Sequence, residues 1–81
     1  MSVKDVVEVM AKALVDQPGD VRVVESAQKS GTLVELYLAP GDVGKVVGKM
    51  GRTVAALRTL ASSAAEREGK TVTLEIRDGK P

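Results

Sequence analysis

The chain has 81 residues, enough for one domain and too few for two. It contains no cysteine, no histidine and 1% aromatic residues, which excludes disulfides, zinc sites, His-based triads and a site built on base stacking. The net charge is +1, but residues 43–65 hold four basic and no acidic side chains, so the positive charge is concentrated in one segment.

The first half of the chain predicts a helix followed by two strands. Apolar residues at helical spacing indicate a helix over residues 3–16, which begins at an N-cap, Ser2, and is stopped by Pro18 and the glycine after it. A β-branched run over residues 21–27 indicates a strand, although two adjacent valines in it leave a bulge or a distorted strand end open. Residues 32–39 alternate and indicate a second strand, which forms an antiparallel hairpin with the first.

The second half predicts two helices and a third strand. Residues 40–47 indicate a short helix opened by a proline, and a glycine-bounded loop follows at residues 48–51. Residues 52–67 indicate a longer helix, with Leu60 among the apolar residues of its buried face. Residues 71–77 alternate strictly and indicate the third strand.

The order α-β-β-α-α-β predicts an α+β fold, with the helices packed on one face of a three-stranded mixed sheet. The connection through two helices makes the second and third strands parallel. We expect a single domain over residues 1–81, with residues 78–81 as a frayed tail. Residues 1–10 lack the apolar core of a signal peptide, and no apolar run approaches the roughly 18 residues of a membrane span, so we expect a cytoplasmic protein without a membrane partner.

The loop between the last two predicted helices carries the chemistry. Gly48 and Gly51 accept positive φ, so the chain can reverse between the helices, and they allow another polymer's backbone to approach closely. The loop leads into a helix N-terminus, whose free N–H groups favour an anion such as phosphate. Lys49, with Lys45 and Arg52 on either side of the loop, adds positive charge for the same partner.

The stretch Val-Val-Gly-Lys-Met-Gly-Arg-Thr-Val at residues 46–54 resembles the signature of the KH domain. That signature is two hydrophobic residues, Gly-x-x-Gly, and a hydrophobic residue three positions later. The predicted element order is similar to the type II, bacterial variant, and residues 42–60 resemble the stand-alone bacterial KH proteins of the KhpA family. The resemblance runs over essentially the whole chain and departs at Met50, where a small or polar residue is common.

The resemblance implies binding of single-stranded RNA, with about four nucleotides clamped over the Gly-x-x-Gly loop. It implies no catalysis, and a role as an RNA chaperone or post-transcriptional regulator with a part in the control of cell shape. It also implies self-association as a homodimer and pairing with a second KH protein of the Jag/KhpB kind. The alanine-rich flank around Ala56 and Ser63 is the candidate surface for the homodimer.

Several further residues are candidates for the RNA groove, each with a plainer alternative. Val46 and Val47 cannot both face the core, so Val47 is expected to line the groove together with Val43. Arg58 and Lys70 extend the basic patch, although a merely solvated face remains open for every basic residue. The expected RNA contacts are Gly48, Lys49, Met50, Gly51, Lys45, Arg52, Val47, Val43, Arg58 and Lys70.

The alternative function is a protein-interaction module, a KH fold that dimerises and binds little RNA. Salt-dependent RNA binding discriminates between the two, because a purely protein interface does not release phosphate counterions. No catalytic residue, metal ligand or cofactor is expected, since no pair of carboxylates lies beside the glycine loop.

Overall fold

The computed structural model describes residues 2–81, and its first helix, α1 (Val3–Leu14), shows how the chain sets an element's limits. The helix begins where the Ser2 Oγ accepts a hydrogen bond from the Asp5 N–H at 3.1 Å, as the capping pattern predicts. The prediction that it continues to residue 16 is wrong. Val15 already has extended backbone angles, and Pro18 opens a separate 3₁₀ turn, Pro18–Asp20.

The sheet has the predicted topology. Strand β1 (Arg22–Gln28) pairs antiparallel with β2 (Gly31–Leu38), which pairs parallel with β3 (Val72–Asp78), in the order β1-β2-β3. The register between β1 and β2 is continuous, so the strand contains no bulge. Of the two adjacent valines, Val23 is buried and Val24 lies half-buried on the opposite face of the sheet.

The third strand extends one residue beyond its expected end. Asp78, predicted as the first residue of the tail, is the last residue of β3. The next residue is also paired, because the Gly79 N–H donates to the Leu38 carbonyl at 2.9 Å. The end of β3 is therefore joined to the end of β2.

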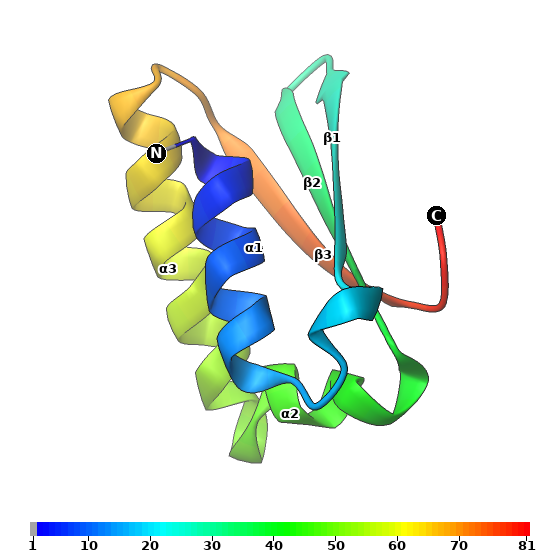
Figure 1. Ribbon diagram of the computed structural model, residues 1–81. Helices are drawn as coiled ribbons and strands as arrows, with labels where there is room; N and C mark the ends of the chain where they lie inside the picture. The colour runs from blue at the N-terminus through cyan, green and yellow to red at the C-terminus, as the bar shows by residue number, and fades with distance from the viewer. Residues whose placement is uncertain (1) are drawn as a thin grey trace.

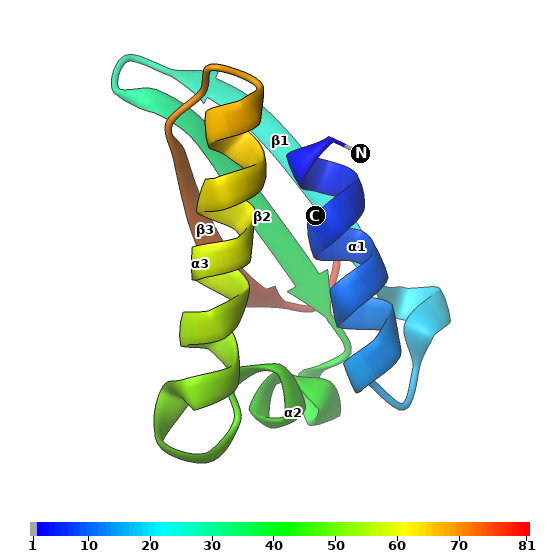
Figure 2. The ribbon, with the colours of Figure 1, turned by 90° about the vertical axis from the view of Figure 1, so that its left-hand side faces the viewer.

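The helices cover one face of this sheet, as predicted. Figure 1 shows the sheet nearly edge-on, with α1 and α3 (Arg52–Arg67) on the same side of it. Figure 2 shows these two helices lying side by side, with the short α2 (Val43–Val47) at one end. No helix within residues 2–81 is long and apolar enough to cross a membrane.

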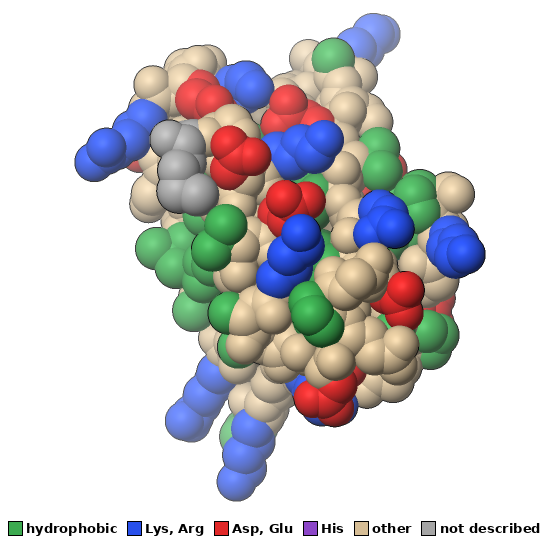
Figure 3. Space-filling model, viewed as in Figure 1, with side chains coloured by type: hydrophobic (Ala, Val, Ile, Leu, Met, Phe, Trp, Pro, Cys, Tyr) green, Lys and Arg blue, Asp and Glu red, His purple; other side chains and the backbone are tan. Residues whose placement is uncertain are grey.

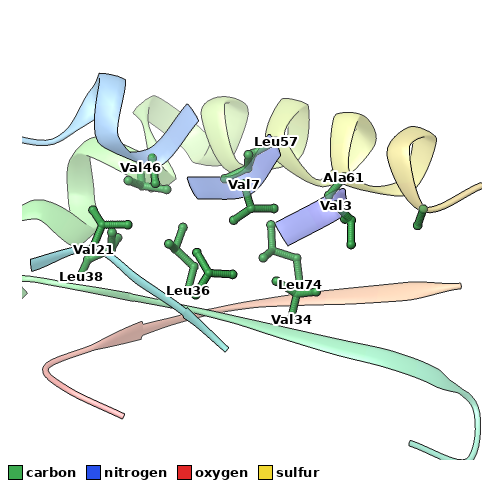
Figure 4. Packing of buried hydrophobic residues seen from close by; sticks show 13 residues of the cluster. Val3, Val7, Val21, Val34, Leu36, Leu38, Val46, Leu57, Ala61 and Leu74 are labelled. Atoms are coloured by element: carbon green, nitrogen blue, oxygen red, sulfur yellow. The ribbon is translucent and has the colours of Figure 1, made fainter. Parts of the chain in front are cut away.

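The core lies between the helical layer and the sheet (Figure 4). On α3 the buried stripe follows the four-residue spacing of Leu57, Ala61 and Ala65. The prediction that Leu60 joins this face is wrong, because Leu60 lies outside the stripe and its side chain is 47% exposed. The largest fully buried side chains are Leu36, Leu38, Leu57, Val3, Val7, Val34 and Val46.

Candidate nucleic-acid interface

The loop between α2 and α3 depends on two glycines in the left-handed region. Gly48 has φ 75° and Gly51 has φ 73°, which meets the predicted need for positive φ at both. A Cβ on Gly48 would also lie 2.6 Å from the Cβ of Thr53, so this position has no room for a side chain. Between the glycines, Met50 is held at φ 58°, and its side chain is 84% exposed.

Two positive side chains project freely from this loop. Lys49 and Arg52 are both exposed, and neither forms an ion pair with any other residue in the described range 2–81. Arg52 is also the first residue of α3, so its charge adds to that of a helix N-terminus. Figure 3 shows Lys and Arg side chains extending from the end of the molecule where this loop lies in Figure 1. The arrangement favours an anion outside the loop.

Lys45, one helical turn before the loop, is engaged elsewhere. Its Nζ lies 3.2 Å from the Asp16 Oδ2 and 3.5 Å from the Asp42 Oδ1, and it donates to the Gly41 carbonyl at 3.4 Å. Asp16 and, after it, Asp42 raise the pKa of Lys45. The positive charge of Lys45 is therefore opposed by Asp42 and by Asp16, an acid distant in the sequence, and its predicted contact with RNA stays a prediction.

Asp42 is the only buried ionisable side chain among residues 2–81, at 3% exposure. Its Oδ1 accepts a hydrogen bond from the Asp16 N–H at 3.3 Å, and its Oδ2 accepts one from the Gln17 N–H at 3.1 Å. Burial alone would raise the pKa of Asp42, but these two bonds and the Lys45 ammonium outweigh it, and the pKa is lowered. The carboxylate joins the connection after α1 to the start of α2.

The remaining predicted contacts lie on α2 and on the middle of α3. Val46 is fully buried, as predicted, whereas Val43 and Val47 are half-buried on α2, and Val43 also packs against the core. Further along, the Arg58 Nε donates to the Leu74 carbonyl on β3 at 3.2 Å. A hollow of about 200 Å³ beside this contact is lined by Arg58, Ser62, Val72, Thr73 and Leu74.

Lys70 is not brought to the loop. It follows the C-terminus of α3, whose 16 residues span about 24 Å from the loop. Its Nζ lies 3.5 Å from the Glu25 Oε2 and 3.7 Å from the Glu68 Oε2. The prediction that Lys70 extends the basic patch is therefore not supported by its position or its contacts.

A larger hollow than the one beside Arg58 lies away from the loop, at the end of the sheet. Its volume is about 370 Å³, and it shares no lining residue with the predicted RNA contacts. It is lined by Asp20, Arg22, Ala39, Pro40, Gly79, Lys80 and Pro81.

With this geometry established, the chain can be compared with known proteins. Residues 4–76 match the family described as KhpA/KhpB, KH domain. The chain belongs to this family. It is 47% identical to the "RNA-binding protein KhpA" of Clostridium perfringens over 73 residues, which cover 90% of this chain and 97% of that protein. It is 44% identical to the protein of the same name from Aquifex aeolicus over 75 residues, which cover 93% and 95%.

A solved structure supports the fold alone. The crystal structure of Aquifex aeolicus Era bound to GDP·AlF4⁻ superposes with a TM-score of 0.68 at 19% identity. The match covers 94% of this chain and 29% of the Era chain. The resemblance to type II KH domains that the loop and element order indicated is thus confirmed for family and fold.

Sequence reasoning missed the carboxylates that hold Lys45. Asp42 lies three residues before Lys45, a spacing that places the two side chains on neighbouring helical positions and was visible in the sequence. Asp16 precedes Asp42 by 26 residues, and only the folded connection after α1 brings it near. No local pattern could have revealed that contact.

Proposed function

We propose that this protein binds single-stranded RNA without catalysis, with the phosphates of the strand lying over the Gly48–Gly51 loop. The observation that carries the proposal is that two exposed cations at the glycine loop, Lys49 and Arg52, form no ion pair within residues 2–81. The loop opens onto the N-terminus of α3, which favours an anion. The names of the relatives, "RNA-binding protein KhpA", support the choice of RNA. The corresponding cellular role is that of an RNA chaperone or post-transcriptional regulator.

The remaining groove residues have secondary roles in this proposal. Val43 and Val47 offer an apolar surface to the bases, and Arg58 offers donors further along the strand. About four nucleotides then occupy the groove. Lys70 is left out, since its charge is neutralised far from the loop.

The decisive experiment reverses the charge of the loop. Lys49→Asp combined with Met50→Asp should abolish binding of a labelled, unstructured RNA, because two carboxylates replace the attraction for phosphate with repulsion. Both side chains are exposed, and Asp tolerates the left-handed backbone of residue 50 better than most residues, so the fold should survive. Fluorescence anisotropy measures binding, and circular dichroism measures folding.

The hairpin turn supplies a matched control. Lys29→Asp with Ser30→Asp changes the net charge by the same amount at two exposed residues of the β1–β2 turn, away from the loop. This control should retain RNA binding. Equal losses in both double variants would show a dependence on net charge alone, and unchanged binding in the loop variant would place the site elsewhere.

The salt dependence separates RNA binding from the alternative of a protein-interaction module. Three phosphate contacts predict a log–log slope of binding against salt of about −2, from roughly −0.7 per phosphate on single strands. A slope near zero, or a preference for duplex RNA, would contradict the proposed groove.

A homodimer is the second part of the proposal, favoured by apolar side chains exposed on the helical layer. Leu60 on α3 and Val9 on α1 are both exposed, and their two helices pack together. Figure 3 shows hydrophobic side chains gathered over this side of the molecule. Burial of such a patch between two copies would stabilise a small domain. A second KH protein of the Jag/KhpB kind is the proposed heterologous partner.

Sedimentation tests the dimer. Leu60→Glu and Ala56→Glu should shift the protein toward the monomer, because each places a charge on the exposed face of α3. Gln28→Glu, at an exposed position on the hairpin, adds the same charge and should leave the association unchanged. A protein that sediments only as a monomer at tens of micromolar would refute the dimer.

A further inference from the structure

Lys45 is placed to bind RNA, but its ammonium is held by acceptors within the protein. It lies one helical turn before Gly48, on the helix that leads into the proposed RNA loop. A lysine ammonium has three N–H donors. In this protein the ammonium donates to the Gly41 carbonyl at 3.4 Å and forms ion pairs with the Asp16 Oδ2 at 3.2 Å and the Asp42 Oδ1 at 3.5 Å.

Backbone contacts hold the Asp42 carboxylate and fix the backbone of Asp16 beside it. Asp42 is buried and accepts N–H bonds from residues 16 and 17, which also fix the position of Asp16 itself. The Asp16 side chain is nevertheless 75% exposed, and that of Lys45 is about half exposed. An exposed pair of this kind is weak and screened by salt, so a phosphate of high local concentration can compete for the ammonium.

We propose that Asp16 and Asp42 compete with RNA phosphate for Lys45, and that Asp16 thereby limits the affinity of the loop for RNA. This inference rests on the proposed function. In the free protein Lys45 is bound to the two carboxylates. When RNA binds, Lys49 and Arg52 make the first phosphate contacts. Removing the charge of Asp16 weakens this hold on Lys45 and makes its ammonium available to a further phosphate oxygen.

The test is the single substitution Asp16→Asn. It removes a charge from a largely exposed side chain and keeps the backbone N–H that Asp42 binds, so the connection should stay folded. We expect RNA affinity to rise about two- to fivefold, the range that an exposed ion pair supplies. The salt slope should steepen by about 0.7, which corresponds to one added phosphate contact on a single strand.

Two further variants make the test specific. Asp20→Asn removes the same charge from an exposed residue of the same connection, and its effect measures the general gain from net charge. In a Lys45→Gln background, Asp16→Asn should give no gain beyond that of Asp20→Asn. The side-chain NMR signal of Lys45 should shift on addition of the same RNA more strongly in Asp16→Asn than in the unaltered protein.

The outcomes separate this inference from the proposed function. Equal gains from Asp16→Asn and Asp20→Asn, or a gain that persists in the Lys45→Gln background, would overturn the competition while leaving RNA binding intact. A loss of affinity in a folded Asp16→Asn protein would also overturn it. If the unaltered protein binds no RNA, or binds it independently of Lys49 and Met50, the proposed function itself fails.

Discussion

The two ends of α3 carry the same local sequence, a glycine followed by a lysine, but the two lysines differ in whether their charge is neutralised. At one end Gly48 (φ 75°) is followed by Lys49, and at the other Gly69 (φ 71°) is followed by Lys70. Lys70 lies between two glutamates, whereas Lys49 has no ion-pair partner within residues 2–81. A glycine–lysine pair at a helix end therefore does not reveal whether its charge is available to a ligand. Distant carboxylates decide that.

The far end of α3 is closed by contacts to other elements. The Lys70 N–H donates to the Ala65 carbonyl at 2.9 Å, which completes the helix cap, and the Glu68 Oε2 accepts from the Val3 N–H at 3.5 Å. Glu25 on β1 adds the third connection. The loop end instead leaves its charged side chains in solvent. One end of the helix holds the domain together, and the other presents charge.

The largest effect should come from the middle of α3, which supports both ends. Leu57→Ala removes a fully buried side chain and should lower the free energy of unfolding by about 2–5 kcal/mol. Leu60→Ala makes the same change in the same helix at a position exposed in the monomer, and at concentrations where the protein is monomeric it should cost less than about 1 kcal/mol. Chemical denaturation measures both. Similar losses at the two positions would show that the buried face of α3 is wrongly assigned.

The second largest effect should come from replacing the glycines at the two ends of α3 by alanine, which should destabilise the protein to different extents. Both require positive φ, which costs an alanine about 1–2 kcal/mol. A Cβ on Gly69 meets open space, but one on Gly48 collides with Thr53. Gly48→Ala should therefore destabilise by about 2–4 kcal/mol, since the strain of overpacking adds to the backbone cost. Gly69→Ala should cost about 1–2 kcal/mol. Equal losses in thermal unfolding would mean that the loop relaxes around the new methyl group.

Prediction from the sequence succeeded for features set by local residues and failed for features set by distant contacts. The element order, the strand directions and the two loop glycines could be predicted, because periodicity, turn residues and short connections are local signals. The end of α1 could not be predicted. Val15 is extended there, so that the N–H groups of residues 16 and 17 reach Asp42, a contact that spans 26 residues for Asp16.

The candidate site shows the same limit at the level of charge. Lys49 and Arg52 could be identified from the glycine motif, and neither forms an ion pair within residues 2–81. Lys45 and Lys70 were also expected to add charge to the basic patch, but each is held by a carboxylate from a distant element: Asp16 after α1 and Glu25 on β1. Charge counted along a segment therefore overestimates the charge that a ligand meets.

Near the loop, one buried carboxylate, Asp42, stabilises the fold, and acid should weaken this stabilisation. The lowered pKa of Asp42 means that its carboxylate stabilises the folded protein above its ordinary pKa, near 4, and that this contribution is lost as the pH falls through the lowered value. Asp42→Asn should melt at a lower temperature than the unaltered protein at pH 7, with the difference narrowing below about pH 4. A difference that does not depend on pH would contradict a role for the charge. Asp20→Asn, at an exposed position, should change neither the melting temperature at pH 7 nor its dependence on pH.

The smallest expected effects come from neutralising Lys49 or Lys70, and they compare the two lysines most directly. Lys49→Gln should weaken RNA binding severalfold and make the salt slope shallower by about 0.7, because one phosphate contact is lost from an otherwise unchanged loop. Its stability should not change, since Lys49 forms no ion pair within the described residues. Lys70→Gln should do the reverse. It should leave RNA affinity and the salt slope unaltered, and it should lower the free energy of unfolding by less than about 1 kcal/mol, as expected for a partly exposed ion pair. The two variants carry the same charge change, so any difference between them reports position alone. Equal losses of RNA affinity would mean that the RNA senses the field of the whole domain rather than the loop.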